Sequence, residues 1–120
     1  MPVTNHVGSA HAARRFTRRV VAPAQSARPG RERLQAYLAG DLASIQDRTF
    51  AGRCFWAAAA AEFDDRPGAV RDAVIDGLRA WLGELERQAR IGGLSEPQEL
   101  AFEVYSLGLG ASTYARLCEI

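Results

Sequence analysis

Hydrophobic residues recur at helical spacing in two long stretches of this 120-residue chain. In the first stretch, apolar side chains return every three or four positions, at Leu34, Tyr37, Leu38, Leu42 and Ile45. In the second, similar spacing joins Val70, Val74, Leu78, Trp81, Leu82 and Leu85. Such spacing places the apolar side chains on one face of a helix. It predicts amphipathic helices over about 31–47 and 67–90, and it predicts that Trp81 is buried.

Two further segments are apolar on most sides. Residues 53–64 contain five consecutive alanines, and alanine is the best helix former and is depleted in strands, so they predict a helix. Residues 96–117 follow Gly92 and Gly93, which favour a helix end, and they predict a last helix. The chain is therefore predicted to be all-α, a bundle of about four helices.

The first 30 residues lack a sustained period and are rich in arginine. The first acidic residue is Glu32, and six arginines precede it. Residues 1–31 therefore have a charge of +6, in a chain of net charge +1. The six arginines are Arg14, Arg15, Arg18, Arg19, Arg28 and Arg31. A segment of this composition buries too little apolar surface to offset its ordering entropy. We therefore expect a disordered basic tail over 1–30, followed by a helical domain over 31–120.

Local motifs between residues 50 and 82 resemble a known family. The motifs are Gly52-Arg53-Cys54-Phe55-Trp56, Glu62-Phe63-Asp64-Asp65-Arg66-Pro67-Gly68, Val70-Arg71-Asp72-Ala73-Val74 and Trp81-Leu82. Over roughly residues 29–118, the chain resembles the C-terminal regulatory domain of TetR-like transcriptional repressors. The resemblance does not extend to the first 28 residues, where such a protein would keep its DNA-binding helices. A bacterial source is indicated by the basic residues, all 15 of which are arginine, and a cytoplasmic location by the two cysteines, which are expected to be reduced.

The resemblance implies two functional regions. In TetR-like domains the equivalent helices surround an apolar effector pocket, and the large aromatic and alanine side chains of that region here are Phe55, Trp56, Ala59, Phe63, Trp81, Phe102 and Tyr105. The family dimerises through its last two long helices, and the second of these would begin where this chain ends, at Ile120. The candidate interface on residues 96–117 consists of Val104, Leu107, Gly108, Ala111 and Ser112. Plain core packing is the alternative for both sets.

Residue types that carry catalysis or bind metals form no known pattern. His6 and His11 have no carboxylate nearby in sequence, which does not match a zinc site. Cys54 has no neighbouring base, so a reduced core thiol is favoured over a nucleophile, and Cys118 is also expected to be reduced. The acidic residues Asp64, Asp65, Asp72 and Asp76 are typical of a turn and a solvated helix face. We predict no enzyme activity, no catalytic residue, no metal and no cofactor.

The predicted function is the effector-sensing and dimerisation domain of a TetR-like repressor, in a truncated form that does not itself bind DNA specifically. Its expected partners are a small apolar effector and a second copy or a related regulator. No membrane association is expected, because the longest apolar run, Cys54–Ala61, is far shorter than the ~18 residues of a membrane span. One alternative is an all-α interaction module that heterodimerises with a full-length regulator. Another is sequence-independent nucleic-acid binding by the arginine tail.

Overall fold

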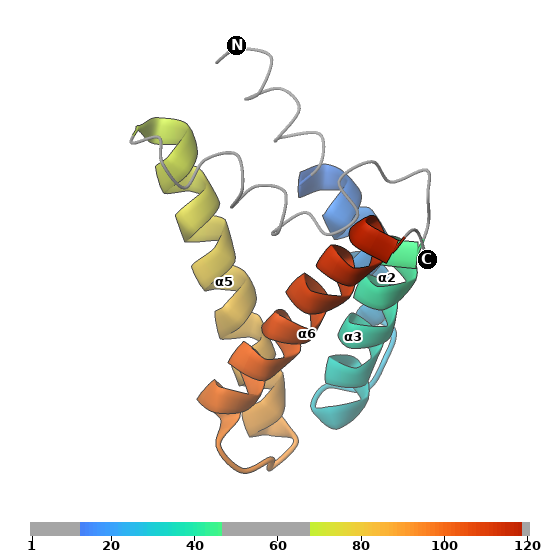
Figure 1. Cartoon of the computed structure of the whole chain (residues 1–120). Helices are drawn as coiled ribbons and strands as arrows, with labels where there is room; N and C mark the ends of the chain where they lie inside the picture. The colour runs from blue at the N-terminus through green and yellow to red at the C-terminus, as the bar shows by residue number, and fades with distance from the viewer. Residues whose placement is uncertain (1–12, 47–67, 119–120) are drawn as a thin grey trace.

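The computed structural model describes residues 13–46 and 68–118, and every regular element in these ranges is helical (Figure 1). Residues 13–24 form one helical segment, with an α-helical turn at 13–16, the π-helical η1 (Thr17–Val21) and α2 (Ala22–Ala24). The long helices are α3 (Arg31–Gln46), α5 (Ala69–Ile91) and α6 (Pro97–Cys118). The all-α prediction and three of the four predicted helices are confirmed. The fourth predicted helix, 53–64, lies outside the described residues.

The long helices form an open arrangement around one core. α5 runs toward the turn at Gly92 and Gly93, and α6 returns from it, so that the two helices diverge away from the turn (Figure 1). α3 packs against both α5 and α6, and the helical segment 13–24 packs against α3. Within residues 13–46 and 68–118, none of the helices has the length and hydrophobicity of a membrane span.

Trp81 lies at the centre of an aromatic cluster. Its ring is 5.0 Å from that of Phe16 at an interplanar angle of 89°, and 5.1 Å from that of Tyr37 at 71°. Aromatic rings prefer such edge-to-face arrangements because the positive edge of one ring meets the negative face of the other. Trp81 is buried as predicted, one turn before the fully buried Leu85. The cluster joins α3, α5 and the helical segment 13–24.

The expected disorder of the first 30 residues is wrong for residues 13–24. Phe16, Val20 and Ala24 are buried, and they recur every four positions along one face of the segment. An isolated segment of this composition would not be stable as a helix. In the folded chain, α3 and α5 supply an apolar surface that these side chains cover. The end of the segment is also held by hydrogen bonds, since the Gln25 amide donates to the Val21 carbonyl and to the Tyr37 hydroxyl. Residues 1–12 lie outside the described residues.

Two glycines bring the start of α3 against the end of α5. Gly30 has a φ of +103°, a conformation that favours glycine, and its N–H donates a 2.7 Å hydrogen bond to the Oε1 of Gln88. A Cβ atom at Gly92 would lie 2.9 Å from the backbone nitrogen of Arg31. Because backbone cannot move aside cheaply, this contact requires a residue without a side chain. The two helices are therefore fixed to each other at one end.

We expect Trp81→Ala to lower the free energy of unfolding by about 3 to 5 kcal/mol, because it leaves a cavity between Phe16 and Tyr37. Urea denaturation followed by circular dichroism measures this loss. The matched control is Phe102→Ala, since the Phe102 side chain is 60% exposed on α6 and its removal creates no cavity. A loss below about 1 kcal/mol for Trp81→Ala would contradict the central role of this ring.

Candidate functional site

The structure separates the predicted pocket residues that it describes. Trp81 is buried beside Phe16, whereas Phe102 is exposed on α6. Tyr105 is half-buried and lies beside Phe102, with ring centroids 6.2 Å apart. Trp81 and Phe102 consequently line two different hollows. The other predicted pocket residues lie outside the described residues: Phe55, Trp56, Ala59 and Phe63.

The first hollow, which we name the Trp81 hollow, has a volume of about 350 Å³. It lies between the helical segment 13–24 and α5. Its described walls are Ala13, Phe16, Thr17, Val21, Gly77, Ala80, Trp81 and Glu84. These side chains are mostly apolar, and π-helical turns such as η1, which contributes Thr17 and Val21, often occur at functional sites. The volume lies near the lower end of the range of small-molecule sites.

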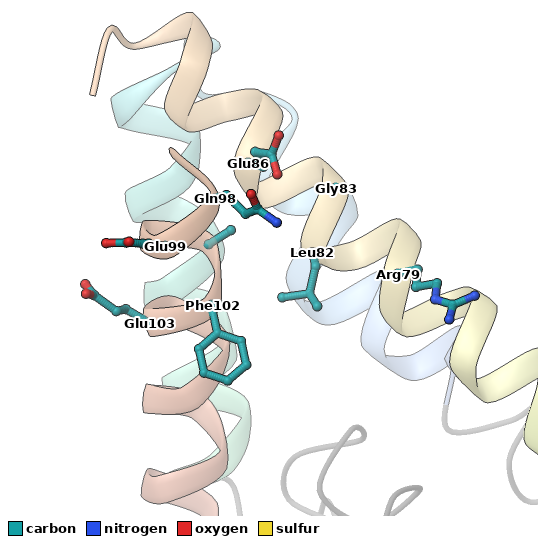
Figure 2. Close-up of a pocket in the computed structure, with 9 residues that line it drawn as sticks. Arg79, Leu82, Gly83, Glu86, Gln98, Glu99, Phe102 and Glu103 are labelled. Carbon is teal, nitrogen blue, oxygen red and sulfur yellow. The ribbon is translucent and has the colours of Figure 1, made fainter. Parts of the chain in front are cut away.

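The second hollow is a larger groove of about 650 Å³ between α5 and α6, which we name the α5–α6 groove (Figure 2). Its walls are Arg79, Leu82, Gly83, Glu86, Gln98, Glu99, Ala101, Phe102 and Glu103. Leu82 extends from α5 toward α6, while Glu99 and Glu103 extend away from α5 (Figure 2). Glu86 is already paired with Arg90 at 2.8 Å. The groove therefore has a small apolar floor and a charged rim.

A polar network borders the Trp81 hollow at Glu84. The Tyr37 hydroxyl and the Gln88 amide donate to Glu84 Oε2 at 2.7 and 2.9 Å, and Arg87 Nε donates to Glu84 Oε1 at 2.8 Å. Burial alone would raise the pKa of Glu84, but the hydrogen bonds from Arg87, Tyr37 and Gln88 outweigh it and lower that pKa. Burial and the hydrogen bond to Glu84 raise the pKa of Tyr37. Glu84 is thus held ionised and Tyr37 protonated, as this network requires.

α3 and α6 approach each other closely at Asp41 and Gly108. Asp41 is 9% exposed, and a Cβ atom at Gly108 would lie 2.5 Å from its Oδ2 atom. In the part of the chain that the structure describes, Asp41 has no hydrogen-bond or ion-pair partner, and burial raises its pKa to about 6. One turn beyond Gly108, the buried Ser112 hydroxyl likewise lacks a partner among the described residues. Small residues on α6 thus accommodate polar groups of the core.

Four of the five predicted interface residues are used within a single chain. Gly108 and Ser112 are buried, and Val104 and Ala111 are partly buried against the core. Leu107 alone among the five is exposed. It belongs to a different face of α6, where the exposed fractions of Leu107, Tyr114 and Leu117 are 57%, 60% and 80%. We name these three residues the outer stripe of α6; the free Cys118 is exposed beside it.

Sequence reasoning named only Leu107 of the outer stripe, because α6 is apolar on both faces and periodicity alone does not tell the inner face from the outer one. It also missed Tyr37 and Glu84, which lie 47 positions apart. A glutamate followed by Arg87 is typical of a solvated helix surface. The burial of Tyr37 in the first predicted helix was a usable signal, since a buried tyrosine hydroxyl needs a hydrogen-bond partner.

We expect the stability contribution of Asp41 to fall as pH rises. Its pKa in the folded protein, about 6, lies above the unfolded value of 3.8, so its contribution to stability is fully present below pH 3.8, and about 3 kcal/mol is lost as pH rises from 3.8 to about 6. Asp41→Asn removes this titration. Urea denaturation at about pH 4 and pH 7 should show the variant gaining stability relative to the parent at the higher pH. Asp76→Asn, at an exposed position of α5, is the control. An equal difference at both pH values would contradict this expectation.

The sequence matches one family of known proteins. The model of the family described as "Tetracyclin repressor-like, C-terminal domain" matches residues 30–119, a region that contains α3, α5 and α6. No curated protein matches the chain. Domains of this family regulate transcription and are not enzymes. Because the match covers most of the sequence, the chain belongs to the tetracyclin repressor-like C-terminal domain family.

Proposed function

We propose that this chain senses a small, mostly apolar effector and dimerises, as part of transcription regulation in a bacterial cytoplasm. Domains of its family bind small-molecule effectors and dimerise. In this chain we assign the effector to the Trp81 hollow and the second copy to the outer stripe of α6. Each assignment rests on the geometry of described side chains and has its own test.

The Trp81 hollow carries the effector assignment because its walls are mostly apolar and come from two elements that the Phe16–Trp81 ring contact joins. Phe16 and Thr17 belong to the helical segment 13–24, and Trp81 and Glu84 belong to α5. Glu84 is already neutralised by Arg87 and accepts from Tyr37, so it offers no unpaired charge to a ligand. An uncharged, mostly apolar molecule therefore suits this hollow best. The α5–α6 groove is larger, but its charged rim does not favour such a molecule.

The outer stripe of α6 carries the dimer assignment. Leu107, Tyr114 and Leu117 follow one another at seven and three positions, which places them on one helix face, and more than half of each side chain is exposed. Large apolar side chains grouped in this way are typical of interfaces, and aromatic residues are enriched there. A second copy of the same stripe supplies a complementary apolar surface. A related full-length regulator with a similar stripe is the alternative partner.

The effector assignment predicts that the neutral apolar probe N-phenyl-1-naphthylamine binds with an increase in fluorescence. Ala80→Phe should weaken its binding by at least about tenfold, because the new ring fills the hollow that Ala80 lines. Ala39→Phe is the matched control, since Ala39 is an exposed helical residue of α3 away from the hollow. Equal binding to the Ala80→Phe variant and the parent would place the effector elsewhere.

The dimer assignment predicts that the parent has the mass of two chains in sedimentation equilibrium and that Leu107→Glu with Leu117→Glu has the mass of one. Two carboxylates in an apolar contact would lose their hydration without gaining a partner. The control pair is Gln35→Glu with Ala39→Glu, which adds the same charge at exposed positions of α3. If both pairs of substitutions leave the mass unchanged, the outer stripe is not the interface.

A further inference from the structure

Four arginines within six positions distinguish the helical segment 13–24 from the rest of the structure. They are Arg14, Arg15, Arg18 and Arg19, and no acidic residue occurs before Glu32. The segment precedes the region that matches the family, yet its apolar face is part of the core. Because Phe16 and Val20 are buried, the rotation of the segment about its axis is fixed. Its arginines are therefore held on a surface of defined orientation.

Arg14 and Arg18 are both exposed, and neither has a hydrogen-bond or ion-pair partner in the described part of the chain. They line a surface hollow of about 550 Å³ together with Ala13 and Thr17. Three other arginines are paired or donate within the structure: Arg87 pairs with Glu84, Arg90 pairs with Glu86, and Arg33 donates to the carbonyls of Gln25 and Ala27. Arg14 and Arg18 thus present two free guanidinium groups about one helical turn apart.

From this surface we infer a further activity: the Arg14/Arg18 face binds the phosphate backbone of duplex nucleic acid without regard to sequence. Guanidinium groups bind phosphate through two parallel N–H donors, which makes arginine the preferred side chain for this contact. Contacts to phosphate carry no sequence information. The segment is a single short helix, and it can contact the phosphate backbone without entering a groove.

The surroundings of these arginines favour a phosphate backbone over a bilayer or an acidic protein. An interfacial helix inserts large apolar side chains beside its basic ones, but Phe16 and Val20 face the core, and the exposed neighbours Ala22 and Pro23 are small. A protein interface has an apolar centre with a polar rim, and the Arg14/Arg18 face has no such centre. A regular array of phosphates needs neither feature. Charge alone is sufficient for its binding.

The test is fluorescence anisotropy of the full chain with two labelled duplexes of unrelated sequence, over about 50 to 200 mM salt. We expect equal affinity for both duplexes and a log-log salt slope between about −2 and −4, since each phosphate contact contributes roughly −0.9 and the segment holds four arginines. Arg14→Gln with Arg18→Gln should make the slope shallower by about 2. Circular dichroism confirms that each variant is folded.

The matched control is Arg28→Gln with Arg79→Gln, which removes two charges at exposed arginines away from this face. The control should keep the slope of the parent. Equal changes in both double variants would show that only net charge matters, and would overturn the inference. So would a strong preference for one duplex, tighter binding to phosphatidylserine vesicles than to duplex, or no binding by the parent at the lowest salt.

Discussion

The hydrogen bonds around Glu84 fix the arrangement on which the rest of the structure depends. Glu84 accepts from Tyr37 of α3 and from Gln88 of its own helix, and Gln88 in turn accepts from the Gly30 backbone. These groups are buried or partly buried, so a shift of α3 along α5 would leave several of them unpaired, at about 1 to 3 kcal/mol each. The network thus fixes the position of α3 along α5. Trp81, one turn before Glu84, takes its place in the aromatic cluster from that position.

The two faces of α6 follow from how closely α3 approaches it. Gly108 leaves room for the Asp41 carboxyl group, and no larger residue would fit without displacing it. Gly108 and the buried Ser112 are therefore used inside the chain. The large apolar residues Leu107, Tyr114 and Leu117 remain outside, where burial against another molecule is the ordinary way to remove them from water. Both faces are apolar, but among residues 13–46 and 68–118 only the inner one packs against other helices.

The spacing of apolar residues predicted the features that depend on local sequence. It did not predict those that depend on packing against another helix. The ends of α3, α5 and α6 and the burial of Trp81 follow from apolar spacing and could be predicted. The segment 13–24 could not, because its short apolar face becomes stable only against α3 and α5. The burial of Gly108 against the Asp41 carboxyl group also depends on a residue far away in sequence. The divergence of Trp81 and Phe102 into two hollows likewise depends on how α5 and α6 diverge, which no single helix encodes.

The same distinction applies to charge. The net charge of +1 suggests a chain with little preference for polyanions. That sum, however, combines arginines that are paired with acidic residues and arginines that have no acidic residue in their own helix. In α5, Arg87 and Arg90 follow acidic residues by three or four positions, and the helix itself brings each pair together. The segment 13–24 has no acidic residue to place at those positions, so its positive charge is not neutralised within its own helix. Because the core fixes which side of the segment faces outward, this charge becomes a local property of one surface, where a phosphate backbone would experience it.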